Sequence, residues 1–110
     1  ADEKMIGVIK ALSDRFGYKP SPGPSGRGIG MACGIDAGTH VAVMIEVKVD
    51  EKTGKVQPIR AVCSQDMGMC VNPQGAIIQV EGCITMGLGY AMAEEVRFRD
   101  GQIYDTNFEP

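Results

Sequence analysis

The sequence contains no tryptophan, a single histidine and few aromatic residues, 5% of its 110 residues. The formal net charge is only −3, and acidic and basic residues are mixed along the chain. No basic stripe is present to neutralise phosphates, so we expect no nucleic-acid partner. Apolar stretches are interrupted by Gly, Glu or Lys well before the ~20 residues that a membrane span requires. The 44% of hydrophobic and 23% of charged residues are instead typical of a folded globular protein.

Cysteine is present, but its spacing suggests no metal or redox motif. The four residues form no Cys-x-x-Cys pair, and three of them lie in apolar, strand-like or helix-like contexts; they are Cys33, Cys63, Cys70 and Cys83. We expect reduced, buried thiols that pack as small hydrophobic groups. The alternative is two disulfides, for which three connectivities exist.

The first part of the chain predicts a helix followed by a loop. Over residues 1–18, apolar residues recur at spacings of three and four, which places them on one face of a helix; they are Met5, Val8, Ile9, Leu12 and Phe16. Gly17 is a suitable C-cap for this helix. Residues 19–27 are rich in proline and glycine and predict a loop.

Residues 28–110 predict an antiparallel α+β core. We expect a short strand from Gly28 to Cys33, a long strand from Thr39 to Val49 and its hairpin partner from Val56 to Ser64. In the long strand, one face is apolar throughout and the other only at one end. The strands precede the next helix without strand–helix alternation, which favours an α+β layer over a parallel sheet. The whole chain, residues 1–110, is expected to form a single domain.

A long glycine-rich helix is predicted from Pro73 to Glu95, with Asn72 as its N-cap. Four glycines lie within it, each at a cost of up to about 1 kcal/mol relative to alanine; they are Gly75, Gly82, Gly87 and Gly89. Such a helix is expected to pack close to a backbone or a ligand. Its apolar residues are expected to face the core, namely Ile77, Ile84, Leu88 and Met92. Asp100-Gly101 then predicts a type I′ hairpin.

Residues that could carry chemistry are few. His40 has no acid or thiol at a ligand spacing and is expected to be a structural residue at a strand end. Glu94 and Glu95 are expected to form ion pairs on the surface with Arg97 and Arg99. We therefore predict neither catalytic nor metal-ligating residues in this chain.

Gln79 is the one candidate for ligand binding. It lies two turns into the glycine-rich helix, its amide both donates and accepts hydrogen bonds, and glycines leave room beside it. From the residues alone two interpretations remain open, a ligand-facing glutamine and an ordinary exposed one. The loop before the helix could also present backbone amides to an anion.

An ordered set of short motifs resembles a known family. The motifs are Thr39-His40-Val41-Ala42, Glu46-Val47-Lys48-Val49-Asp50, Asp66-Met67-Gly68, Val71-Asn72-Pro73, Gln79-Val80-Glu81-Gly82 and Gly87-Leu88-Gly89. In this order they resemble the molybdenum-binding subunit of the xanthine dehydrogenase and aldehyde oxidoreductase family. The stretch from Glu94-Glu95 to Asn107-Phe108 is similar to the β-subunits of its isoquinoline 1-oxidoreductase branch. The resemblance extends from about Gly26 to Pro110.

The resemblance implies a molybdenum hydroxylase that adds water-derived oxygen to an aldehyde or an N-heterocycle. It implies a molybdenum-pterin cofactor and electron transfer to [2Fe-2S] clusters on an iron–sulfur small subunit or domain. Gln79 matches the family's glutamine that hydrogen-bonds the pterin. Glu81 is expected to be structural, and Gly82 and Gly87 to allow close packing near the cofactor.

The chain also departs from the family. The glutamate that acts as a base near the metal, and the other cofactor-binding loops, have no counterpart here, and the family's subunits are several times longer. We therefore expect a fragment that forms one wall of a cofactor site, is inactive alone and retains no cofactor. A homodimer through surfaces that the parent protein covers is also expected. The alternative is a stand-alone, non-enzymatic interaction module derived from the family.

Overall fold

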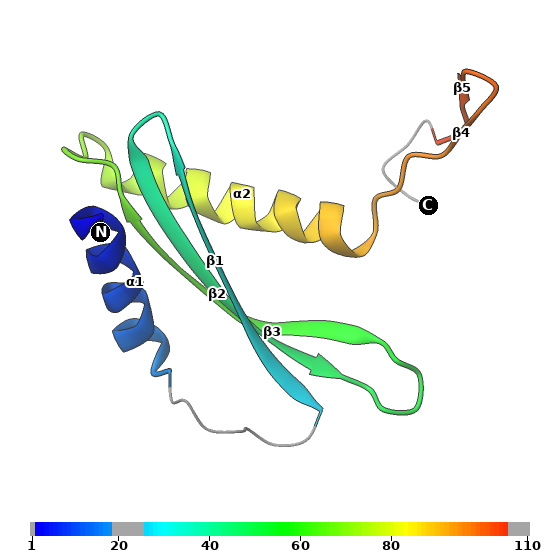
Figure 1. Cartoon of the computed structure of the whole chain (residues 1–110), viewed down its shortest axis with the longest axis horizontal. Helices are drawn as coiled ribbons and strands as arrows, with labels where there is room; N and C mark the ends of the chain where they lie inside the picture. Colours follow the sequence, from blue (N-terminus) through cyan, green and yellow to red (C-terminus); the bar gives the residue numbers. More distant parts are fainter. Residues whose placement is uncertain (1, 19–25, 106–110) are drawn as a thin grey trace. The chain divides into compact units, whose positions relative to one another are not determined.

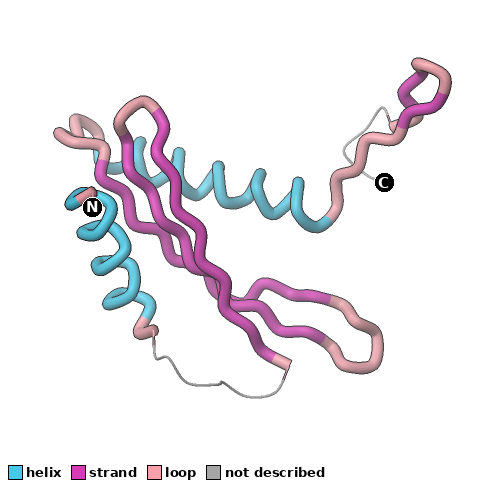
Figure 2. Tube along the Cα trace, viewed as in Figure 1, coloured by secondary structure: helices cyan, strands magenta, loops and turns pink. Residues whose placement is uncertain are grey.

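The computed structural model describes residues 2–18 and 26–105 (Figure 1). In chain order the elements are α1 (Glu3–Phe16), β1 (Arg27–Asp36), β2 (Thr39–Val49), β3 (Val56–Asp66), α2 (Pro73–Met92), β4 (Phe98–Arg99) and β5 (Gln102–Ile103). Helices and antiparallel strands confirm the predicted α+β class (Figure 2). The chain divides into two compact units, Ala1–Met69 and Cys70–Pro110. Compactness alone does not show whether the two units fold independently, so the single domain stays a prediction.

The first unit contains a three-stranded antiparallel sheet in the order β1-β2-β3. A tight turn joins β1 to β2, with Ala37 and Gly38 both at positive φ (49° and 82°). Two such residues are what a type I′ hairpin requires. Between β2 and β3 the register shifts at Glu46/Val47, which indicates a β-bulge.

Both outer strands are longer than the sequence predicted. β1 runs from Arg27 instead of Gly28 and continues past Cys33 to Asp36, and β3 continues past Ser64 to Asp66. The physical reason is that the eleven residues of β2 offer backbone hydrogen-bonding groups to the strands on both sides. Pairing therefore extends into stretches whose own sequence pattern is weakly strand-like. Of the predicted loop over residues 19–27, residues 19–25 lie outside the described part of the chain.

The α1 helix is capped at both ends, at its C-terminus by the predicted Gly17 and at its N-terminus by Asp2. The Asp2 carboxylate accepts hydrogen bonds from the amides of Lys4 and Met5 at 3.1 and 3.2 Å. At the other end Gly17 adopts the left-handed conformation with φ 73°, and its amide donates to the carbonyl of Ser13. These caps satisfy backbone groups that the helix itself leaves unpaired.

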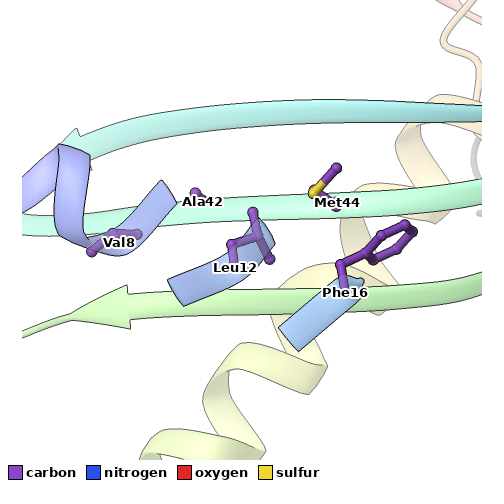
Figure 3. Packing of buried hydrophobic residues seen from close by; sticks show 5 residues of the cluster. All are labelled: Val8, Leu12, Phe16, Ala42 and Met44. Carbon is purple, nitrogen blue, oxygen red and sulfur yellow. The ribbon is translucent and has the colours of Figure 1, made fainter. Parts of the chain in front are cut away.

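The core of this unit lies between α1 and the sheet (Figure 3). Helix α1 packs on β2 and β3. The buried side chains are Val8, Leu12 and Phe16 of α1 and Ala42 and Met44 of β2. Leu12 is completely buried. Helix α1 thus covers the face of β2 that is apolar only at one end. Val41 and Val43 lie on the other face, which is apolar throughout, and are half-buried.

Polar contacts hold α1 to the sheet at each end. Nε2 of His40 lies 2.9 Å from Oδ2 of Asp2, and Nδ1 lies 3.2 Å from the carbonyl oxygen of Gly38. His40 is buried, and its acid partner lies 38 residues away, beyond any local motif; its structural role stays a prediction. At the other end Arg60 donates to the carbonyl of Phe16 at 2.9 Å, and its guanidinium stacks 3.8 Å from the centroid of that ring.

The second unit contains α2 and a short hairpin. The helix prediction was wrong in two respects, because α2 ends at Met92 and not at Glu95, and none of its residues is buried. Of the four residues expected to face a core, Ile77 and Met92 are 51% and 48% exposed, and Ile84 and Leu88 are only half-buried. The hairpin was predicted correctly, since Asp100 and Gly101 have φ values of 52° and 77°. No helix within residues 2–18 and 26–105 has the length and apolar character needed to cross a membrane.

Two smaller expectations need correction. The cysteines carry thiols, as expected, but Cys33, Cys70 and Cys83 are exposed and Cys63 is half-buried. Cys33 lies on the edge strand β1, and Cys70 lies in the loop between β3 and α2. The carboxylate that holds Arg97 is Asp105, at 2.8 Å, and not the neighbouring Glu94 or Glu95 that the sequence suggested. The hairpin reversal brings Arg97 and Asp105 together, and this contact lowers the pKa of Asp105.

We expect Leu12→Ala to destabilise the protein by about 2–5 kcal/mol, because it leaves a cavity at the largest fully buried side chain among the described residues. Ile6→Ala is the matched control, since Ile6 lies on the same helix but is 53% exposed. Its effect should stay within about 0.5 kcal/mol. Urea unfolding followed by circular dichroism measures both, and equal losses would contradict the assignment of the core.

We expect Asp2→Asn to reduce the loss of stability in acid. The hydrogen bond from His40 is the largest cause that lowers the pKa of Asp2 below its ordinary value of 3.8, and the amide of Met5 contributes next. A lowered pKa stabilises the fold above the unfolded-state value, and this contribution is lost as the pH falls through the folded-state value. Asparagine still caps the helix but does not titrate.

The measurement is the melting temperature of both proteins at pH 6 and near pH 3. The fall between the two pH values should be smaller for Asp2→Asn than for the unmodified protein. An equal fall in both would show that the Asp2–His40 contact does not contribute to acid sensitivity.

Candidate functional site

The start of α2 is fixed by its N-cap. The side-chain oxygen of Asn72 accepts a hydrogen bond from the amide of Gly75 at 3.0 Å, and Pro73 occupies the first helical position. Both features follow the sequence prediction. Along the helix, the period of about 3.6 residues per turn determines which residues share a face.

Two of the four glycines in α2 have a local structural explanation. A Cβ atom at Gly75 would lie 2.8 Å from Nδ2 of Asn72, so this position must stay bare for the cap. A Cβ atom at Gly89 would lie 3.0 Å from Oε1 of Glu94, whose amide also donates to the Gly89 carbonyl. These two glycines therefore accommodate the ends of the helix.

The other two glycines have no such explanation within the structure. A Cβ atom at Gly82 or at Gly87 would meet nothing within 4 Å, so each leaves the helix backbone open. Glycine in a helix interior costs up to about 1 kcal/mol relative to alanine. An open glycine that relieves no clash is suited to the close approach of a group outside this part of the chain.

Gln79 lies on the same face of α2 as Gly82. Residues three, four and seven positions apart share a helix face, which here groups Gln79 with Gly82, Cys83 and Met86; we call this the Gln79 face. The Gln79 side chain is exposed, and its Nε2 donates to Sγ of Cys83 at 3.6 Å. This bond leaves the amide oxygen and the second N–H hydrogen able to bind a ligand.

The chemistry of the Gln79 face suits a neutral, planar, hydrogen-bonding ligand. It offers an amide and a thiol beside open backbone, and the single charged residue of α2, Glu81, lies outside it. These residues fit a pterin, whose ring edge carries hydrogen-bond donors and acceptors. Within residues 2–18 and 26–105, no three His, Cys, Asp or Glu side chains are arranged to hold a metal ion.

A surface hollow lies elsewhere, at the hairpin between β2 and β3. Its volume is about 530 Å³, and it is lined by Gly26, Lys48, Val49, Asp50, Glu51, Lys52, Lys55 and Gln57. It contains none of the residues predicted to bind a cofactor. The lining combines three lysines with two acids on an exposed loop, so we attach no chemistry to it.

Comparison with known proteins identifies the kind of domain that these features belong to. The model of the molybdopterin cofactor-binding domain family matches residues 37–110, a stretch that includes all of α2 and the Gln79 face. The chain therefore belongs to this family. The resemblance to molybdenum-binding subunits that the sequence motifs indicated is confirmed.

Individual relatives agree with this assignment. The chain is 28% identical to one subunit of the nicotinate dehydrogenase of Pseudomonas putida, over 94% of its own length and 10% of the relative's. It is 28% identical to the beta subunit of the isoquinoline 1-oxidoreductase of Brevundimonas diminuta, over 92% of its length and 13% of the relative's. One subunit of a probable xanthine dehydrogenase of Bacillus subtilis is 38% identical over 62% of the chain and 9% of the relative. The chain thus spans about a tenth of the length of these relatives.

We expect Gly82→Ala to stabilise α2 by up to about 1 kcal/mol, because alanine favours the helix and its Cβ meets no neighbour. Gly75→Ala is the control, since its Cβ would press on Asn72 and weaken the cap. Melting temperatures of the two variants of this chain should move in opposite directions. A loss of stability in Gly82→Ala would mean that the position is not open.

Proposed function

We propose that this chain is part of the molybdenum-binding subunit of a molybdenum hydroxylase and contributes one wall of the cofactor site. The observation that carries the proposal is the Gln79 face, an exposed amide beside an open glycine on a helix that the family model matches. A glutamine side chain can bind the edge of a pterin through both donor and acceptor atoms. Of the described residues, Gln79 is the one we assign to the cofactor.

The reaction we propose for the complete protein is the oxidation of an aldehyde or an N-heterocycle. When bound, the molybdenum-pterin cofactor supplies the transfer of water-derived oxygen and takes up the two electrons of the substrate. An iron–sulfur small subunit or domain with [2Fe-2S] clusters is proposed as the electron acceptor. Two relatives are named for nitrogen heterocycles, nicotinate and isoquinoline, which favours this substrate class.

The contribution of this chain is binding and orientation. The Gln79 amide holds the pterin edge, and its bond to Cys83 limits the directions the amide can take. Gly82 lets the cofactor approach the helix backbone. Glu81 is proposed to be structural; its backbone carbonyl accepts a hydrogen bond from the Thr85 hydroxyl at 2.9 Å. We propose that the chain alone neither retains the cofactor nor catalyses the reaction, because the remaining walls and the catalytic base belong to other segments.

We expect Gln79→Ala, made in the complete protein, to weaken pterin binding about fivefold, the equivalent of about 1 kcal/mol for one lost hydrogen bond. Molybdenum and pterin per mole of purified protein are measured by elemental analysis and pterin fluorescence, with the cofactor supply kept limiting. The melting temperature of the cofactor-free protein should not change, since Gln79 is exposed.

Gln74→Ala is the matched control for this experiment. Gln74 is also exposed on α2, but it lies five residues before Gln79 and so about 140° around the helix axis. Its cofactor content should equal that of the unmodified protein. If Gln79→Ala and Gln74→Ala retain the same amount of cofactor, Gln79 does not bind the pterin and the proposed site is wrong.

A further inference from the structure

The α1 side of the sheet carries an apolar row that α1 leaves uncovered. In the register of the sheet, β1 residues lie directly opposite β2 residues, and opposite residues point to the same side. Met31 lies opposite the buried Met44, and Cys33 opposite the buried Ala42. The side chains of β1 on this core side form what we call the β1 row: Ile29, Met31, Cys33 and Ile35.

The β1 row is unusually exposed for residues next to a core. Ile29, Met31 and Ile35 are 47%, 52% and 56% exposed, and Cys33 is exposed as well. The geometry explains this exposure. A helix with its side chains is about 10–12 Å wide and strands are about 4.8 Å apart, so one helix covers about two strands. Helix α1 packs on β2 and β3, and β1 is the edge strand beyond them (Figure 1).

Polar contacts border the β1 row at both ends. Arg27 pairs with Glu46 at 3.7 Å where β1 begins, and the Asp2–His40 contact lies beside Ile35 where it ends. Between these ends the row is uncharged and continuous with the buried side chains of β2. An apolar patch with polar borders that extends a core is suited to a second layer element and not to water.

We propose that an amphipathic helix from the remainder of the molybdenum-binding polypeptide packs beside α1 and covers the β1 row. This inference rests on the proposed function, in which the chain is part of a longer polypeptide. The relatives leave ample chain for such a helix, since this sequence spans only 10% and 13% of their lengths. A helix is favoured because it continues the layer that α1 begins, whereas an added strand would pair with the edge of β1 and leave its face open.

Cys33 provides a test of this inference within the row itself. Trypsin cleaves after Arg27 and Lys48, and the resulting peptide, residues 28–48, contains Cys33 as its single cysteine. The rate of maleimide labelling at Cys33 can therefore be followed by mass spectrometry in the complete protein and in this 110-residue chain. We expect labelling in the native complete protein to be at least about tenfold slower than in the chain alone.

Three results would overturn the inference. Equal labelling rates in both proteins would show that no segment outside this chain covers the row. Protection that disappears when a dimer of the complete protein is diluted to monomers would assign the row to a second copy. Protection that disappears when a separate iron–sulfur protein is removed would assign it to that partner.

Met31→Lys gives an independent measurement. In the chain alone the exposed lysine should leave the melting temperature unchanged, whereas in the complete protein it should speed Cys33 labelling about tenfold, because a charge cannot be buried under an apolar helix. Unchanged protection of Cys33 in this variant would contradict the inference.

Cofactor content in Gln79→Ala is the separate readout of the proposed function. A protein with Gln79-dependent cofactor binding but an open β1 row would refute this inference alone.

Discussion

The burial of the α1 stripe against β2 and β3 is the interaction on which the first unit depends. A three-stranded sheet has two faces, and without a covering element both are exposed to water. Leu12, which is completely buried, packs with Val8 and Phe16 over Ala42 and Met44. Their contact turns one face of the sheet into a core. The other features of the unit follow from where α1 lies.

The polar contacts of α1 depend on this packing and reinforce it. Asp2 and Arg60 act at opposite ends of the helix, a carboxylate at the N-terminus and a cation at the C-terminus, which is the arrangement that the helix dipole favours. Each contact crosses from helix to sheet and requires the packing of the apolar side chains that holds the two layers together. The width of α1 also explains why β1 stays bare.

The α2 helix follows a different physical principle. It buries none of its side chains and carries one charge, Glu81, although a helix apolar on several sides is normally found inside a protein. Gly75 and Gly89 accommodate their own neighbours, whereas Gly82 and Gly87 open onto space. We propose that such a helix is suited to contacts with a group outside its own unit. Membership of a molybdopterin cofactor-binding family gives a reason for that construction.

The sequence by itself determined the features that depend on neighbouring residues. The C-cap Gly17 of α1, the N-cap Asn72 of α2 and the Asp100-Gly101 turn were predictable because they arise within a few residues of backbone. The placement of Gln79 and Gly82 on one face follows from the helical period. The family was indicated by short motifs that occur in a characteristic order. Tertiary structure alone decided that Ala42 and Met44 form the core, and that His40 meets Asp2. Those outcomes depend on which layer covers which face, and contacts 38 residues apart leave no local pattern in the sequence.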